Sequence, residues 1–180
     1  MSKGMYKKRL VEAMNLLSEN EKTIFLGQSV AVEGTAMRGT LLDIPKHKLL
    51  ELPVEEDFQM GLANGLAISG RIPISVFPRW NFLLLATNQI VNHLNNFERL
   101  TRLSVPPKVI IRTGIGSTNP LHPGVQHVGD FTDAFKILAP NLEIIRLDSS
   151  EQIVPEYTKA LERKDGKSTL LIEWSDKYLE

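Results

Sequence analysis

The chain has 180 residues, which is enough for one globular domain and short for two. Hydrophobic residues make up 42% and charged residues 23%, as in ordinary soluble proteins, and 21 basic side chains balance 21 acidic ones. The zero net charge argues against a dedicated nucleic-acid or membrane-surface binder, because such proteins usually carry a basic excess. The absence of cysteine excludes disulfides, thiolate catalysis and cysteine-bound metals.

The first residues, MSKGMYKKRLVEAM, are basic but polar and amphipathic, without the apolar core of a signal peptide. The longest apolar stretch, from Phe82 to Ala86, is far too short to span a bilayer. We therefore expect a soluble protein of the cytoplasm.

Hydrophobic periodicity predicts helices and strands that alternate along the chain. The patterns favour helices at residues 6–17, 55–69, 81–97, 131–138 and 149–162, the third of them with Asn81 as its N-cap. Short apolar runs favour strands at residues 23–27, 73–77, 108–112, 142–147 and 169–174. Residues 28–52 have weak periodicity and are expected to form a loop with a short helix near 39–42.

Strands that are continuous apolar runs, separated by helices, indicate a mostly parallel sheet covered on both faces. The predicted fold is therefore α/β, in three α/β/α layers, with a sheet of five or six strands. No internal repeat or linker interrupts the pattern, so residues 1–180 are expected to form a single domain.

Residues 52–83 form the first candidate site. It combines an acidic pair at the start of a small-residue helix with aromatics after the next strand: Glu55, Glu56, Phe77, Trp80 and Phe82. Such a set suits a flat, nitrogen-rich ring, because a carboxyl group can share a proton with a ring nitrogen and aromatics can stack on its face. From the residues alone the simpler alternative is favoured, since the helix dipole attracts acidic residues to a first turn and the aromatics can be core.

A long loop at residues 113–129 is the second candidate. It follows a strand end, where ligands bind in open α/β sheets, and loops longer than about 12–15 residues are usually functional or disordered. It carries His122 and His127, for which a flexible surface loop with incidental histidines is the alternative. The roles of Arg79, Arg112 and His122 are left open, including contact with a phosphate or carboxylate group.

Six segments in order resemble the pyrimidine-binding domain of transketolase-like thiamine diphosphate enzymes, most closely the β subunit of 2-oxo acid dehydrogenase E1 components. They cover almost the whole chain. They are TIFLGQSVAVEGT, LPVEEDFQMGLANGLAISGRIPISVF, NFLLLATNQIVNHL, PPKVIIRTGIGS, HPGVQHVGDF and NLEIIRLDSSEQI. No single segment is decisive, but the order of the six is specific.

The resemblance assigns roles to individual positions. Glu56 matches the family's glutamate that shares a proton with a ring nitrogen of the cofactor's aminopyrimidine, and the glycine spacing of its helix favours it over Glu55. Phe82 matches the aromatic that stacks on the pyrimidine, and Trp80 is expected to line the same pocket. His127 matches the loop histidine that faces the substrate and stabilises a developing oxyanion.

The chain departs from the family pattern beside Glu56, where Phe58 also replaces a glycine, and beside His127, and the change beside His127 leaves the substrate class open. Asp57 stands where the family usually has Gln, Ala or Met, and His127 is followed by Val128 and Gly129 in place of a Ser-Gln pair. The substrate is expected to be a small keto compound or sugar. The reaction would be ketol transfer, or decarboxylation or dehydrogenation of a 2-oxo acid.

The family holds the cofactor's diphosphate through Mg²⁺, bound by a GDG motif in a separate domain. This chain has no GDG motif and offers no metal site of its own, and the C-terminal transketolase domain is also expected to be absent. The resemblance therefore implies a split enzyme, in which a diphosphate-binding subunit with GDG supplies the Mg²⁺ ligands in an α₂β₂ assembly. Self-association of this chain is a further expectation, and neither nucleic acid nor membrane is an expected partner.

The alternative function is non-catalytic. A degenerate module that keeps the fold would act as a structural or regulatory partner, and the altered neighbours of Glu56 and His127 allow this. A nucleotide binder is disfavoured because no phosphate-cradling glycine loop follows a strand.

Overall fold

The computed structural model describes residues 4–101, 103, 107–119 and 121–178. Six strands form one sheet in the order β2-β1-β3-β4-β6-β5, and every neighbouring pair is parallel. The strands are β1 Thr23–Gly27, β2 Leu49–Glu51, β3 Ile72–Phe77, β4 Ile110–Ile115, β5 Glu143–Arg146 and β6 Thr169–Trp174. The predicted parallel sheet is confirmed.

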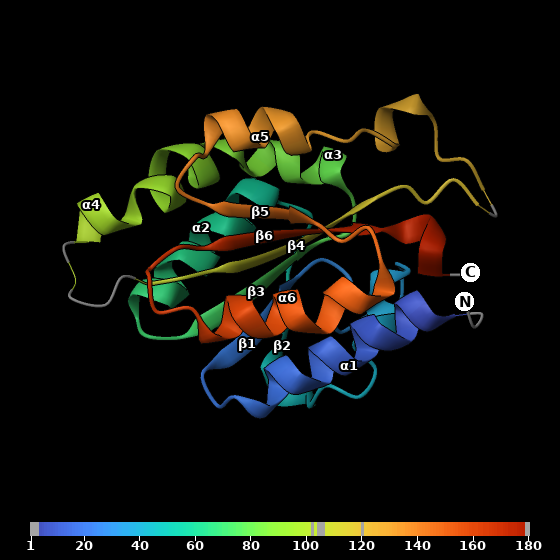
Figure 1. Ribbon diagram of the computed structural model, residues 1–180, viewed down its shortest axis with the longest axis horizontal. Coiled ribbons are helices and arrows are strands. Elements are labelled where there is room, and N and C mark those ends of the chain that lie inside the picture. Colours follow the sequence, from blue (N-terminus) through green and yellow to red (C-terminus); the bar gives the residue numbers. More distant parts are fainter. Residues whose placement is uncertain (1–3, 102, 104–106, 120, 179–180) are drawn as a thin grey trace.

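The helices form a layer on each face of this sheet (Figure 1). Helices α1 (Met5–Glu19) and α6 (Ser150–Glu162) pack on one face and share one hydrophobic core with it. The other face carries α2 (Glu56–Ile68), α3 (Trp80–Leu83), α4 (Phe97–Thr101) and α5 (Thr132–Leu138), with a second core beneath them. The three-layer α/β/α architecture is therefore confirmed.

Strand β4 shows why continuous apolar runs predicted this fold. All six of its residues are buried, and successive side chains point to opposite faces. Ile110 packs in the core under α1 and α6, whereas Ile111 packs in the core on the other side. A strand covered on both faces needs apolar side chains on both of its sides, so apolar and polar residues do not alternate along its sequence.

Because all strands are parallel, their carboxyl ends lie at one edge of the sheet. The segments that leave this edge after β2, β3 and β4 are residues 52–55, residues 78–79 and the long loop from Gly116 to Gly129. The loop contains the short 3₁₀ turn η6 (Val125–His127), which contacts α3. In Figure 1 this gold segment extends beyond the end of the sheet, beside α3. Both candidate sites therefore lie at the same edge.

The predicted helix at residues 81–97 is correct in position but not in form. The helical run begins at Trp80, after Arg79 as N-cap, so the expected capping role of Asn81 is wrong. Beyond α3 it is irregular, with 3₁₀ turns η3 (Leu84–Ala86) and η5 (Leu94–Asn96) around a π turn, η4 (Gln89–His93). Side-chain amides bond carbonyls in this stretch, such as Asn64 to Gln89 at 3.1 Å, and compete with the regular helical ladder.

Strand β2 was not predicted from the sequence. It has only three residues, all half-buried, and pairs with β1 at one border of the sheet. Three residues are too few for a periodic signal. The expected short helix within residues 28–52 exists as η1 (Met37–Thr40), and a second 3₁₀ turn, η2 (Lys46–Lys48), leads into β2.

In the described residues no helix has both the length and the hydropathy needed to cross a membrane.

Two glycines provide a matched test of this packing. Gly27 ends β1 with φ +149°, and a Cβ there would lie 2.4 Å from the Val76 carbonyl oxygen. Gly65 lies in the middle of α2, where a Cβ would meet no atom within 4 Å. We expect Gly27→Ala to lower the free energy of unfolding by about 1–3 kcal/mol and Gly65→Ala to raise it by about 0.5–1 kcal/mol. Urea unfolding of the isolated chain measures both, and a stabilising Gly27→Ala would contradict the described packing.

Candidate functional site

Glu56 is the first residue of α2, at the carboxyl edge of the sheet. Its exposed fraction is 7%, whereas Glu55 is exposed to solvent. No hydrogen bond among the described residues involves the Glu56 carboxylate. The carboxylate therefore remains available to a ligand, although most of the side chain is covered by the protein. Burial therefore separates the two members of the acidic pair, and Glu56 is the one in a position to meet a ligand at this edge.

A buried glutamine fixes the start of α2 against the sheet. The Gln59 side-chain amide donates to the carbonyl of Val76 at 2.9 Å and to the hydroxyl of Ser75 at 3.1 Å, both on β3. The same amide lies close to Gly27, which has no side chain to exclude it. Sequence reasoning missed Gln59; its only signal is a polar residue one helical turn after Glu56, on the buried side.

Asp57, the departure beside Glu56, is bonded within the chain. Its carboxylate accepts a hydrogen bond from the Gln89 side-chain amide at 3.1 Å, and the Gln89 side chain lies against Gly61. This contact joins the first turn of α2 to the π turn η4. The small residue at position 61 allows the two helices to come this close.

Phe82 and His127 meet although 45 residues separate them in the sequence. Their rings lie edge to face, with centroids 5.5 Å apart and planes at 66°. Both residues are half-buried, and the buried Nδ1 of His127 has no hydrogen-bond partner among the described residues. The structure thus brings the proposed stacking aromatic and the proposed substrate-facing histidine together at the edge where α2 begins.

Trp80 lies in a different place from the one expected. Its side chain is completely buried and packs edge to face on Phe135 and Phe131, with ring centroids 4.8 and 6.1 Å apart. A ring with no exposed surface cannot contact a ligand in this conformation. The structure therefore places Trp80 in the core, as the simpler alternative had it, and not in a cofactor pocket.

Arg79, Arg112 and His122, for which contact with a phosphate or carboxylate group was left open, all form hydrogen bonds within the chain. Arg79 donates to the main-chain carbonyls of Gly116 and His127, and burial lowers the pKa of its guanidinium. Arg112 is fully buried and pairs with Glu173. The Nδ1 atom of His122 accepts from the main-chain N–H of Gly124 at 3.1 Å. Each of the three thus has at least one ring or guanidinium nitrogen bonded within the chain, and Arg112 is in addition fully buried.

Another carboxylate organises the edge beside Glu56. Glu51, the last residue of β2, accepts hydrogen bonds of 2.6, 2.9, 2.7 and 3.2 Å from the four successive main-chain N–H groups of residues 29–32. Such a cluster of donors stabilises a carboxylate strongly. Glu51 thereby shapes the loop that follows β1, a feature that could not be expected while β2 was taken as part of a loop.

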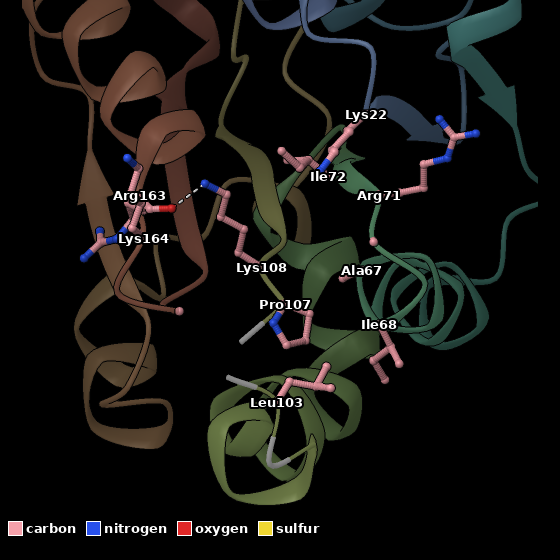
Figure 2. Close-up of a pocket in the computed structure, with 12 residues that line it drawn as sticks. Lys22, Ala67, Ile68, Arg71, Ile72, Leu103, Pro107, Lys108, Arg163 and Lys164 are labelled. Carbon is pink, nitrogen blue, oxygen red and sulfur yellow. Dashed lines mark hydrogen bonds between the residues drawn. The ribbon is translucent and has the colours of Figure 1, made fainter. Parts of the chain in front are cut away.

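A hollow of about 320 Å³ lies at the opposite edge, at the amino ends of the strands (Figure 2). Its rim carries basic side chains, namely Lys22, Arg71, Lys108, Arg163 and Lys164. The Lys108 ammonium donates to the carbonyls of Leu161 and Arg163, and Figure 2 shows Arg71 extending away from it. Because the cations do not converge on one point, and Glu56 lies at the other edge, this hollow is not the candidate site.

Within the part of the chain that the structure describes, no group of three or more His, Asp or Glu side chains is arranged to hold a metal.

The sequence is similar to β subunits of 2-oxo acid dehydrogenases, although no family model matches it. It is 28% identical over 148 residues to the 3-methyl-2-oxobutanoate dehydrogenase subunit beta of Mycobacterium tuberculosis, covering 76% of this chain and 40% of that protein. It is 30% identical over 140 residues to the pyruvate dehydrogenase E1 component subunit beta of Gracilaria tenuistipitata var. liui, covering 76% of this chain and 42% of that protein. The chain thus spans about two fifths of the length of these relatives.

Two solved structures have the same fold. One is a split gene transketolase, described as an inactive β4 tetramer, with a TM-score of 0.66 and 20% identity over 96% of this chain and 50% of that chain. The other is a protein of Mycobacterium smegmatis assigned as a thiamin diphosphate-dependent enzyme, with a TM-score of 0.67 and 12% identity over 99% of this chain and 32% of that chain. Sequence and fold confirm the resemblance seen in the six segments: the chain is a homologue of part of the β subunits of 2-oxo acid dehydrogenases, and it has the α/β fold of transketolase-like proteins.

Proposed function

We propose that this chain is the pyrimidine-binding subunit of a split thiamine diphosphate-dependent enzyme. The observation that carries the proposal is the position of Glu56, which is only 7% exposed, lies at the carboxyl edge of the sheet and has no hydrogen-bond partner for its carboxylate in the described chain. An enzyme that binds a protonatable heterocycle needs such a group, because a carboxyl group can share a proton with a ring nitrogen. Homology to E1 β subunits favours this catalytic role over a non-catalytic module.

The residues at this edge fit one half of the cofactor. Glu56 would hold the pyrimidine through a ring nitrogen, and the half-exposed ring of Phe82 would stack on its face. The half-buried imidazole of His127 would donate to a substrate oxygen, where it would stabilise developing negative charge. When bound, thiamine diphosphate supplies the electron sink for breaking or forming a carbon–carbon bond next to a carbonyl group. The substrate would be a 2-oxo acid or a keto sugar.

The other half of the site would come from a partner. We propose a diphosphate-binding subunit with a GDG motif that supplies the Mg²⁺ ligands, in an α₂β₂ assembly working in the cytoplasm. Three exposed apolar side chains border the edge that such a subunit would cover, with exposed fractions of 67% for Val54, 51% for Phe58 and 65% for Leu85. Exposed apolar residues gathered around a site are typical of surfaces that a partner covers.

Binding of thiamine diphosphate tests the proposal. Isothermal titration would compare this chain alone, with and without Mg²⁺, with this chain mixed with a GDG-bearing subunit encoded beside it. We expect the mixture to bind at least about 100-fold more tightly, since losing about 3 kcal/mol of diphosphate and Mg²⁺ contacts weakens binding by that factor. Full-affinity, Mg²⁺-dependent binding by this chain alone would contradict the split site. Absence of binding by the mixture, with assembly intact, would favour the non-catalytic module.

A further inference from the structure

Four successive residues at the start of α3 each contact the long loop or the residues that end it. Arg79 bonds the carbonyls of Gly116 and His127, the second at 3.1 Å. The neighbouring Trp80 packs against Phe131, just beyond the loop. These two contacts involve residues near both ends of the loop. A short helix anchored in the core therefore holds the loop near both of its ends.

The other two residues complete the contact. The side-chain oxygen of Asn81 accepts from the main-chain N–H of Gly129 at 3.2 Å, and the ring of Phe82 meets the ring of His127. Gly129 has no room for a side chain, because a Cβ there would lie 2.6 Å from the Phe131 ring. Asn81, predicted as a helix cap, thus holds the loop instead.

Arg79 makes the contact that bears most directly on His127. The same Nη1 atom donates to two carbonyls, so residues 116 and 127 are held to one point. Hydrogen bonds from a charged donor are stronger than neutral ones, and their strength increases where water is partly excluded, as it is around this half-buried side chain. No carboxylate of the described residues forms an ion pair with Arg79, and the two loop carbonyls are the partners of its Nη1.

His127 has few other restraints. Its main-chain N–H donates to the carbonyl of Gly124 at 3.1 Å, which closes the turn, but its buried Nδ1 has no partner in the described chain. The ring direction therefore depends on the backbone position, set by Arg79, and on the edge-to-face contact with Phe82. Moving the backbone would move the ring.

We propose that Arg79 is a positioning residue, which holds the backbone of His127 so that the imidazole faces the reacting group at the carboxyl edge. The inference rests on the proposed function for its catalytic consequence. Its structural part, the dependence of the His127 ring on Arg79, concerns this chain alone. The role proposed for Arg79 acts through its Nη1 atom, which is engaged by the two carbonyls.

A double-mutant cycle in the assembled enzyme tests the catalytic part. Arg79→Met is expected to lower kcat about tenfold with little change in KM, because misplacing a catalytic group by a fraction of an ångström has effects of this size. In a His127→Asn background the same substitution should change kcat by less than about twofold, since it has no imidazole left to misplace. An equal loss in both backgrounds would overturn the proposal.

The isolated chain gives a second readout that needs no cofactor. His127→Asn identifies the His127 ring signal in a ¹H–¹³C NMR spectrum, and Arg79→Met should shift or broaden that signal while leaving those of His47 and His93 in place. Arg79→Lys keeps a cation that can bond one carbonyl, so its spectrum and kcat should fall between those of wild type and Arg79→Met. Arg71→Met is the matched control, because Arg71 also donates to a main-chain carbonyl, that of Glu21 at 3.3 Å, but at the opposite edge.

The two readouts separate the possible failures. An unchanged His127 signal in folded Arg79→Met would overturn the positioning role, whatever the enzyme does. If the mixture of subunits has no thiamine diphosphate-dependent activity, the proposed function fails, and the spectrum still decides whether Arg79 positions the ring.

Discussion

Replacing Glu56 by glutamine is expected to lower kcat of the assembled enzyme by about 10²–10⁴-fold, the range observed when a group that exchanges a proton is removed. Glutamine has nearly the same shape, so the start of α2 and its attachment through Gln59 should be unchanged. A carboxamide cannot share a proton with a ring nitrogen as a carboxyl can. Steady-state turnover and thiamine diphosphate binding, measured side by side, would show whether chemistry or binding is lost.

Glu55→Gln is the control for that experiment. Glu55 precedes α2 and is exposed, so its charge can be removed with little effect on turnover or stability. The isolated Glu56→Gln chain should unfold at about the same urea concentration as wild type, because glutamine keeps the shape of the side chain and no hydrogen bond of the described chain is lost. Unchanged turnover in Glu56→Gln would contradict the proposed catalytic role and favour the structural or regulatory module.

The sequence was sufficient for the fold because the signals it uses are local and repeated. The strands β3, β4 and β6 each have six residues, nearly all buried, and each contains a short apolar run. A strand as short as Leu49–Glu51 lacks that signal. The irregular turns after α3 also escape prediction, because they depend on side chains from other elements, such as Asn64 bonding the carbonyl of Gln89.

For the candidate site, the sequence could propose residue types but not their neighbours. The glycine spacing of the helix favours Glu56 over its neighbour Glu55, and burial then separates the two side chains. Trp80 and Phe82 are both aromatic residues near the same strand end, yet one ring is entirely in the core and the other reaches His127. The contacts of Arg79 and Glu51 join segments that the fold brings together, so no local pattern in the sequence could have shown them.

A buried charged network joins the core to the site edge. Arg112 on β4 donates from Nε and Nη2 to the two carboxylate oxygens of Glu173 on β6, at 2.5 and 2.9 Å, and both side chains are completely buried. The hydroxyls of Tyr157 and Tyr178 also donate to Glu173. Burial alone would lower the pKa of Arg112, but the charge of Glu173 raises it well above its ordinary value. Burial and the same charge raise the pKa of both tyrosines.

Glu173→Gln is therefore expected to lower the free energy of unfolding by about 3–5 kcal/mol, because it leaves the Arg112 charge buried without its counter-ion. In a chain of this size that corresponds to a fall in Tm of roughly 10 °C. Differential scanning calorimetry of the isolated chain measures the change. Should the variant fail to fold, Tyr157→Phe removes one hydrogen bond to the same carboxylate and is expected to destabilise the chain by about 1–2 kcal/mol.

The control for this prediction is the pair between Arg9 and Glu12 on α1. Its Nη1–Oε2 distance of 2.6 Å is close to the 2.5 Å of the buried pair, but its side chains are 45% and 51% exposed. Water screens such a pair, so Glu12→Gln should change stability by less than about 1 kcal/mol. Equal effects of Glu12→Gln and Glu173→Gln would contradict the importance of burial.

The buried network is also expected to affect the loop that carries His127. Strand β6 leads to Asp176, whose carboxylate accepts hydrogen bonds from the main-chain N–H groups of Thr118 and Asn119, so weakening the network should loosen this loop. Faster hydrogen exchange at residues 118–119 in Glu173→Gln would show that the charged core and the site edge are coupled.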